Sequence, residues 1–219
     1  MNPDQVRLAY NTGAAAYVSA VPDPGVEAPI DRAMVDAFIA AVTAAGADPL
    51  VLDAGCGAGR MSRYLADRGC RVRGVDLSEG MVSYARRDHP DLDFAVGSLA
   101  ALPYPDRRFA GVLLWYSAIH TPPAGQSRLF AEAARVLRPG GHLLIGFQAG
   151  EGVRDVSPVY LRLGYQVRLD RYCYSADQVA GFLASAGLRE VSRLIRRPRD
   201  NERDDQAMVL ARADDLTGR

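Results

Sequence analysis

A chain of 219 residues, 48% of them hydrophobic and 24% charged, is long enough for one α/β domain with a buried core. Its 26 basic and 26 acidic side chains cancel, which argues against a nucleic-acid partner, because nucleic-acid-binding proteins usually carry a basic excess. Three widely spaced cysteines, no apolar run of about 18 residues and no secretory signal predict a cytoplasmic protein with reduced thiols, without a metal site or a membrane partner.

Apolar runs typical of buried strands alternate along the chain with helical patterns. Helices are expected over residues 4–18 and 28–45, before the first strand. Strands are then expected at 50–53, 72–76, 92–96, 110–116 and 142–148, with helices at 59–67, 79–87 and 126–137. This alternation predicts βαβ units with right-handed crossovers, and therefore a parallel sheet.

The part of the chain after the fifth strand is less regular. Residues 149–171 show no clear periodicity, so we expect an irregular connection of the length that functional loops have. Ser175 begins a capping-box pattern for a helix that Gly187 ends. Strands are expected near 188–195 and 206–211, and the charged segment 196–205 between them should face solvent. No repeat or linker interrupts the chain, which predicts a single domain over 1–219.

The strongest functional pattern is Asp-Ala-Gly-Cys-Gly-Ala-Gly-Arg at residues 53–60, between the first strand and the next helix. Its glycines allow a tight turn and the close approach of a ligand to the backbone. The spacing differs from the G-x-G-x-x-G of dinucleotide folds because Arg60 replaces the last glycine. Asp53 would also repel a pyrophosphate, whereas it suits the cationic S-adenosylmethionine (SAM).

Asp76 ends the second predicted strand, 23 residues after Asp53. A carboxylate at this point of a doubly wound sheet can accept hydrogen bonds from both hydroxyls of a ribose. The same arrangement serves dinucleotides, so Asp76 predicts a nucleoside ligand without deciding which one.

Three segments together resemble the class I SAM-dependent methyltransferases. They are residues 53–60, Gly-Val-Asp-Leu-Ser-Glu-Gly-Met at 74–81, and Ala-Arg-Val-Leu-Arg-Pro-Gly-Gly-His-Leu at 134–143. The resemblance implies a Rossmann-like, doubly wound α/β fold. Its seven-stranded sheet would have the order 3-2-1-4-5-7-6, an antiparallel seventh strand and helices on both faces. It also implies an N-terminal helical cap over 1–46 and a substrate lid over 149–171.

The resemblance further implies SAM as cofactor and S-adenosylhomocysteine (SAH) as product. It would bring Asp53 near the methionyl ammonium, Asp76 onto the ribose, and Ser98 near the adenine. Serine replaces the family's usual aspartate at position 98 and would be a weaker, uncharged acceptor. The cofactor-binding residues that we predict are Tyr17, Asp53, Gly55, Cys56, Gly57, Arg60, Asp76, Leu77, Met81, Ser98, Leu99 and Trp115.

Two aromatic segments remain open to more than one interpretation. Tyr10 and Tyr17 share a helix face and resemble the family's cap helix, in which a tyrosine closes over SAM; they equally suit core packing. Tyr116 and His120, after the fourth strand, are the candidate catalytic residues. His120 is either a general base near the methyl acceptor or a structural histidine.

These residues predict an enzyme that transfers a methyl group from SAM to an N, O or C atom of a small metabolite, as a monomer or homodimer. A module that binds SAM or a nucleoside without transferring a methyl group is the first alternative, because a fold alone does not establish chemistry. An NAD(P)-dependent oxidoreductase is the second, and Asp53 and Arg60 disfavour it.

Overall fold

Seven strands form one mixed sheet in the computed structural model, which describes residues 2–44, 48–162, 165–200 and 202–214. The order is β3-β2-β1-β4-β5-β9-β8, in which the first five strands run parallel and β9 runs antiparallel to β5 and β8. This arrangement confirms the predicted order 3-2-1-4-5-7-6, with β9 as the antiparallel seventh strand. The strands are β1 (Leu50–Ala54), β2 (Arg71–Asp76), β3 (Asp93–Val96), β4 (Phe109–Trp115), β5 (Leu137–Ala149), β8 (Leu188–Arg196) and β9 (Asp205–Ala213).

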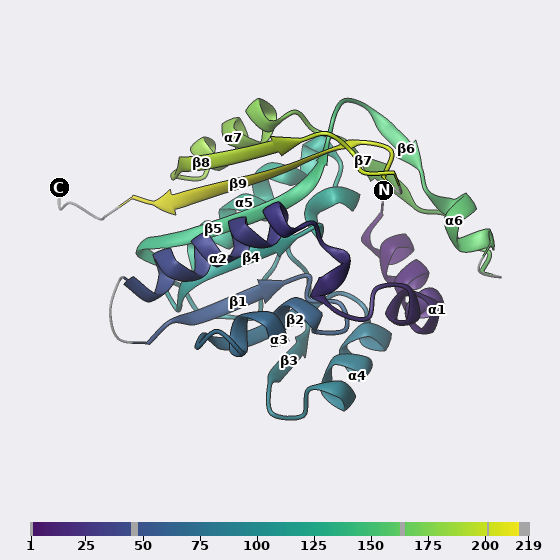
Figure 1. Cartoon of the computed structure of the whole chain (residues 1–219), viewed down its shortest axis with the longest axis horizontal. Helices are drawn as coiled ribbons and strands as arrows, with labels where there is room; N and C mark the ends of the chain where they lie inside the picture. The colour runs from purple at the N-terminus through teal and green to yellow at the C-terminus, as the bar shows by residue number, and fades with distance from the viewer. Residues whose placement is uncertain (1, 45–47, 163–164, 201, 215–219) are drawn as a thin grey trace.

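Helices cover both faces of this sheet (Figure 1). One face packs against α5 (Pro123–Val136) and α7 (Ala176–Ser185), and the other against α2 (Pro29–Ala44) and α3 (Arg60–Ala66). The central strand β4 shows why the sequence folds this way: Leu114 belongs to the first core cluster and Leu113 to the second. A strand that is apolar on both sides requires a layer of helices on each.

The helix α1 (Pro3–Ala20) lies beyond the carboxyl ends of the parallel strands (Figure 1). Asn2 and Gln5 form a capping box at its start. Within α1, the Asn11 side-chain oxygen accepts hydrogen bonds from the Ser78 hydroxyl (2.6 Å) and the Gly80 amide (3.0 Å) at the start of α4 (Glu79–Asp88). The helix is therefore attached directly to the segment that follows β2. Residues 1, 45 and 46 of the predicted cap lie outside the described residues.

The expectation of an irregular connection over 149–171 was wrong. The segment contains β6 (Val153–Asp155), α6 (Ser157–Arg162) and β7 (Asp170–Tyr172), and β6 pairs with β7 in a separate antiparallel ribbon. Three-residue strands are too short to show a two-residue periodicity, which explains why the sequence pattern missed them. Residues 163 and 164 lie outside the described part of the chain.

The two ends of the charged segment 196–205 are more buried than predicted. The Arg196 guanidinium bonds both the buried Asp31 carboxylate (2.6 and 2.7 Å) and Glu202. Asp204 is buried as well and forms ion pairs with Arg154 and Arg171 of the ribbon. These pairs attach the β6–β7 ribbon to the end of the main sheet. The prediction therefore holds for residues 197–200 and 203, which are exposed, and fails for Arg196 and Asp204, which are held in ion pairs.

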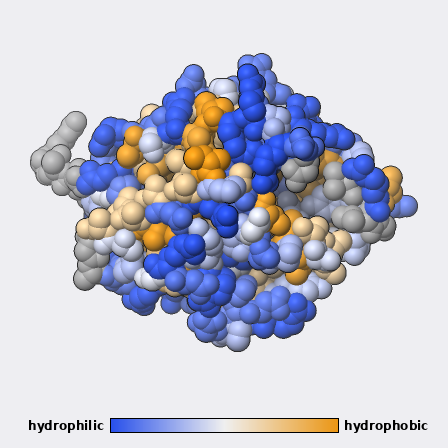
Figure 2. Space-filling model, in the orientation of Figure 1, coloured by the Kyte–Doolittle hydropathy of each residue, from blue (hydrophilic) through white to orange (hydrophobic). Residues whose placement is uncertain are grey.

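The face with α2 in front is mostly hydrophilic, and its apolar side chains appear in separate patches (Figure 2). Within the residues that the structure describes, no helix combines the length and the apolar character needed to cross a bilayer.

Candidate functional site

Two adjoining cavities lie at the carboxyl end of the sheet, a larger one of about 350 Å³ and a smaller one of about 340 Å³. Tyr17, Gly55, Gly57 and Trp115 line both. The remaining predicted site residues are divided between them. The larger cavity is lined by Asp76, Leu77, Met81, Ser98, Leu99, Tyr116 and His120, and the smaller by Asp53, Cys56 and Arg60. The structure thus brings every predicted site residue together around one continuous region.

The glycine-rich turn between β1 and α3 separates the two cavities. Gly55 packs closely against the segment after β4, since a Cβ there would lie 2.2 Å from the Cβ of Ser117. Gly57 has a φ of +53°, and a Cβ at this position would meet no protein atom within 4 Å. Backbone that approaches open space without a side chain is the arrangement needed to hold a ligand closely.

Asp76 lies at the end of β2, beside this turn. One carboxylate oxygen accepts from the Gly57 amide and the other from the Ser78 amide, both at 2.8 Å. Burial raises the pKa of Asp76, and the backbone N–H groups oppose that rise by stabilising the anion. Each oxygen retains a second lone pair, so the carboxylate can still accept hydrogen bonds from two hydroxyls of a ligand.

Asp53 is a second carboxylate at the site, fully buried at the end of β1 and on the smaller cavity. It accepts a hydrogen bond from the Ser62 hydroxyl at 2.6 Å. Burial raises the pKa of Asp53 to about 6, and the bond from Ser62 and the charge of Arg60 oppose this. A buried carboxylate that faces a cavity provides a favourable position for a cationic group.

Arg60 and Trp115 share Glu27, a residue that the sequence analysis did not identify. The Arg60 guanidinium lies 2.6 Å from a Glu27 carboxylate oxygen, and the Trp115 indole N–H donates to the same oxygen at 3.0 Å. Glu27 lies in the connection between α1 and α2, after the 3₁₀ turn Pro24–Val26. No local pattern marks such a residue, because its partners are 33 and 88 positions away in the sequence.

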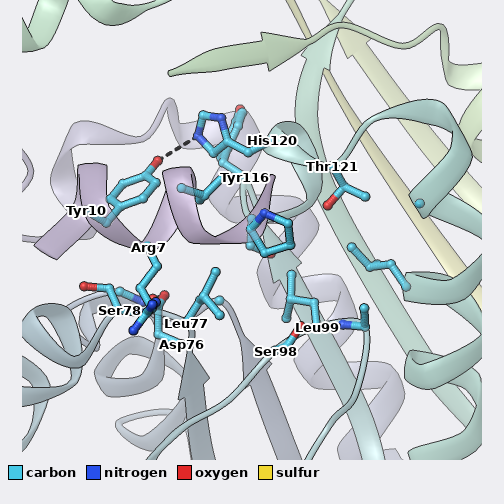
Figure 3. A pocket seen from close by; sticks show the side chains of 18 of the residues that line it. Arg7, Tyr10, Asp76, Leu77, Ser78, Ser98, Leu99, Tyr116, His120 and Thr121 are labelled. Carbon is cyan, nitrogen blue, oxygen red and sulfur yellow. Dashed lines mark hydrogen bonds between the residues drawn. The ribbon is translucent and has the colours of Figure 1, made fainter. Parts of the chain in front are cut away.

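His120 lies on the larger cavity and is buried. Its Nδ1 is 2.7 Å from the Asp170 carbonyl oxygen, which can only accept, so Nδ1 carries the hydrogen. Its Nε2 therefore accepts from the Tyr10 hydroxyl at 2.9 Å (Figure 3). Burial lowers the pKa of His120 to about 4, and the imidazole is consequently neutral at neutral pH.

Tyr10 of α1 contacts both His120 and α6, the helix between β6 and β7. Its ring meets His120 and Tyr17 edge to face, with centroid separations of 5.6 and 5.9 Å. It also meets the Tyr160 ring of α6 in this way, at 6.3 Å. Gly13 makes room for Tyr160, because a Cβ at that position would lie 3.0 Å from the ring. Tyr10 and Tyr17 thus both pack against other aromatic rings and line the larger cavity.

The remaining predicted residues differ in what their side chains contact. Tyr116 has a φ of +55°, and its hydroxyl donates to Gln206 at 2.8 Å. Burial raises the pKa of Tyr116 far above its usual range. The Ser98 hydroxyl accepts from the Ala100 amide at 3.2 Å. Cys56 belongs to a small core cluster with Phe94 beneath the glycine-rich turn, and burial raises the pKa of its thiol.

Comparison with known proteins identifies relatives of this chain. A family profile described as a methyltransferase domain matches residues 51–141. A demethylmenaquinone methyltransferase of Beutenbergia cavernae is 39% identical over 108 residues, which are 48% of this chain and 44% of that protein. A malonyl-[acyl-carrier protein] O-methyltransferase of Enterobacter lignolyticus is 31% identical over 160 residues, which are 73% of this chain and 62% of that protein. The chain thus spans less than two thirds of the length of either relative.

A solved structure shares the fold over nearly the whole chain. Magnesium protoporphyrin IX methyltransferase of Synechocystis PCC 6803, crystallised with bound SAM, superposes with a TM-score of 0.71 and 22% sequence identity, covering 96% of each chain. The sheet order, the matched domain and these relatives agree with one another. We conclude that the chain belongs to the class I SAM-dependent methyltransferase family.

Proposed function

We propose that this chain is an enzyme that transfers a methyl group from SAM to an N, O or C atom of a small molecule and releases SAH. The observation that carries the proposal is a pair of carboxylates, the buried Asp53 and the half-buried Asp76, on either side of a glycine-rich turn whose Gly57 leaves space for a ligand. The larger cavity continues from this turn to His120, which provides room for an acceptor beside the cofactor.

The charges of these cavities suit SAM better than a dinucleotide. Asp76 would accept from the ribose hydroxyls, and Asp53 would face the methionyl ammonium. Arg60 would approach the methionyl carboxylate, while Glu27 holds its guanidinium in place. A pyrophosphate at the same turn would meet the Asp53 carboxylate, and the positive charge of Arg60 is already balanced by Glu27. This disfavours an NAD(P)-dependent oxidoreductase.

The remaining residues that we assign to the cofactor follow from the lining of the larger cavity. Leu77, Met81 and Leu99 provide apolar contacts for an adenine ring, and Ser98 an uncharged polar one. Trp115 and Tyr17 line both cavities and would cover the junction between the nucleoside and the methionine moiety. Cys56 would contribute backbone rather than its thiol, because that side chain packs in the core.

Alignment is the main contribution that the protein makes to such a reaction. Bound SAM supplies an electrophilic methyl group: the acceptor's lone pair forms the new bond to carbon, and sulfur keeps the electrons of the broken carbon–sulfur bond. The chain must then hold the acceptor in line and exclude water. Tyr116 would position the acceptor with its ring, because its hydroxyl hydrogen is engaged by Gln206.

His120 would receive the acceptor's proton indirectly. Its Nε2 is bonded to the Tyr10 hydroxyl, so a proton from the acceptor would move to Tyr10 Oη as the Tyr10 proton moves to Nε2. The Asp170 carbonyl would support the resulting imidazolium. With a pKa of about 4, His120 is a weak base. It would take the acceptor's proton only once the new bond to the methyl carbon has made the reacting O–H or N–H group acidic.

Ligand titration and product analysis test the proposal. SAH should bind and raise the melting temperature, whereas NADH should not, since a ligand selective for the folded state stabilises it. Incubation with methyl-labelled SAM and fractionated metabolites should then transfer label to a small molecule. Binding of SAH without any labelled product would favour a SAM-binding module without methyl transfer, and preferential binding of NADH would refute the proposal.

We also propose that the acceptor is a free small molecule rather than a nucleic acid and that the enzyme acts in the cytoplasm as a monomer or homodimer. The equal numbers of acidic and basic residues support the first point. Light scattering of the purified chain measures its oligomeric state, and addition of duplex DNA or RNA should leave SAH affinity unchanged.

A further inference from the structure

The part of the larger cavity that is left to an acceptor has a consistent hydrogen-bonding character. We call it the acceptor wall: it comprises the lining residues within 3–10 of α1, 116–122 after β4 and 124–129 of α5, together with Ser78 and Ala100. Apolar side chains such as Val6, Ala124 and Leu129 form much of this wall. That this wall receives a methyl acceptor rests on the proposed function.

Most polar side chains of the acceptor wall have already donated their hydrogens within the protein. The Tyr10 hydroxyl donates to His120 Nε2, and His120 Nδ1 donates to the Asp170 carbonyl. The Tyr116 hydroxyl donates to the Gln206 side-chain oxygen at 2.8 Å. The Tyr10 and Tyr116 oxygens can therefore still accept a hydrogen bond from a ligand. None of the three side chains has a hydrogen left to donate.

The two serines of the wall follow the same rule. The Ser117 hydroxyl donates to the Ala54 carbonyl at 2.7 Å, and the Ser78 hydroxyl donates to Asn11 at 2.6 Å. Among the described neutral side chains of the wall, Thr121 alone has a hydroxyl that bonds no other protein group, since Tyr174 bonds its backbone carbonyl instead. Among the side chains of the wall, a bound acceptor therefore meets several oxygen lone pairs and one uncommitted neutral donor.

Charged side chains strengthen this bias. The two cations of the wall, Arg7 and Arg128, lie towards solvent: Arg7 pairs with the exposed Asp4, and the exposed Arg128 donates to the Ala100 carbonyl. SAM carries one net positive charge, against the two carboxylates Asp53 and Asp76, while Arg60 and Glu27 balance each other. The loaded site would therefore remain negative, and an anion in its interior would find only the Thr121 hydroxyl as a neutral side-chain donor and no compensating cation.

We propose that the methyl acceptor is an uncharged, mainly apolar molecule. Its reacting group is a hydroxyl or an amine, each of which carries a hydrogen, and not a carboxylate. Its O–H or N–H group would donate to the oxygen lone pairs of Tyr10, Tyr116 or Ser117, and Thr121 would supply the one donor from a neutral side chain. An anionic group on the same molecule would be accommodated only at the solvent edge, near Arg7 and Arg128.

A pair of matched probes tests this proposal on the intact chain. The protein is first saturated with SAH, and 2-naphthol and 2-naphthoate are then titrated separately at pH 7.5 in a calorimeter. We expect 2-naphthol to bind roughly tenfold more tightly than the carboxylate, because only the anion loses hydrogen bonds on entering the wall. Equal affinities, tighter binding of 2-naphthoate, or no binding of either probe would overturn the proposal. Failure of SAH itself to bind would instead count against the proposed function.

Variants at Thr121 extend the test. Thr121→Val, which keeps the shape of the side chain, should weaken 2-naphthol binding several-fold. Thr43→Val is the matched control, since Thr43 lies on α2 and its hydroxyl bonds the Ile39 carbonyl. Thr121→Lys should reverse the preference towards 2-naphthoate. Ala124→Trp should block both probes while SAH still binds; if 2-naphthol affinity survived it, the probe would be binding elsewhere and the assignment of this wall would fall.

Discussion

Asp76→Ala is the substitution that most directly tests how the site holds a nucleoside. In the wild-type chain the carboxylate accepts from the Gly57 and Ser78 amides, each at 2.8 Å, and retains lone pairs for two ribose hydroxyls. Alanine removes both functions at once. We expect the variant to fold, because the strand β2 and its core contacts do not depend on this side chain.

The size of the effect follows from the hydrogen bonds that are lost. A hydrogen bond to a charged group contributes about 1.5–3 kcal/mol, so two bonds to a ribose amount to roughly 3–6 kcal/mol. Because the Gly57 amide also loses its partner and the turn becomes less ordered, the lower figure is a minimum. SAH should therefore bind at least about 100-fold more weakly.

Calorimetry with two ligands separates the ribose contacts from disorder in the turn. In the wild-type chain, 5′-methylthioadenosine should bind more tightly than its 2′-deoxy analogue. In Asp76→Ala that difference should disappear, because the partner of the 2′-hydroxyl is missing. If the folded variant binds SAH with unchanged affinity, or still distinguishes the two nucleosides, Asp76 does not hold the ribose.

Further substitutions test the other parts of the site. Arg60→Met should weaken SAH about tenfold and leave 5′-methylthioadenosine unchanged, because that ligand lacks the amino-acid moiety; equal loss for both would contradict the carboxylate contact. Asp53→Asn should lower SAH affinity yet raise the free energy of unfolding at pH 7.5 by on the order of 1–3 kcal/mol, since the buried carboxylate has a pKa of about 6 and is costly to ionise. Burial lowers the pKa of His120 to about 4, so the unfolded chain takes up that proton first and stability falls as pH decreases from 6.5 towards 4. His120→Gln should reduce this acid sensitivity in denaturant titrations, and an unchanged pH dependence would show that His120 is not neutral in the folded state. Gly57→Val should abolish SAH binding with a normal circular dichroism spectrum, and retained affinity would place the ligand elsewhere.

The main sheet and the meeting of the glycine-rich turn with Asp76 were predictable because each depends on short-range patterns. A strand such as β4 is apolar on both faces, which is visible in seven consecutive residues. The turn at 53–60 and Asp76 lie at the ends of neighbouring parallel strands, so their meeting follows from topology alone. Backbone constraints at Gly55 and Gly57 likewise belong to the turn itself.

The rest depends on contacts between distant segments, which no local pattern records. Glu27 meets Trp115 across 88 positions, and Arg196 meets Asp31 across 165. The Tyr10–His120 pair spans 110 positions and joins a cap helix to a loop of the core. Residues of these types also occur on ordinary surfaces, so only their placement distinguishes them. The β6–β7 ribbon was missed because its strands are too short to show a periodicity and are stabilised by each other.

The contact between Asn11 and the start of α4 connects α1, on one side of the cavity, to the segment that follows Asp76 on the other. Asn11 accepts hydrogen bonds from Ser78 and Gly80, and Ser78 in turn caps α4 two residues after Asp76. If α1 swings outward to admit a ligand, these bonds break, and the segment beside the ribose position loses an anchor. We therefore expect binding of the nucleoside and the return of α1 to its place against α4 to be coupled, so that neither is complete without the other.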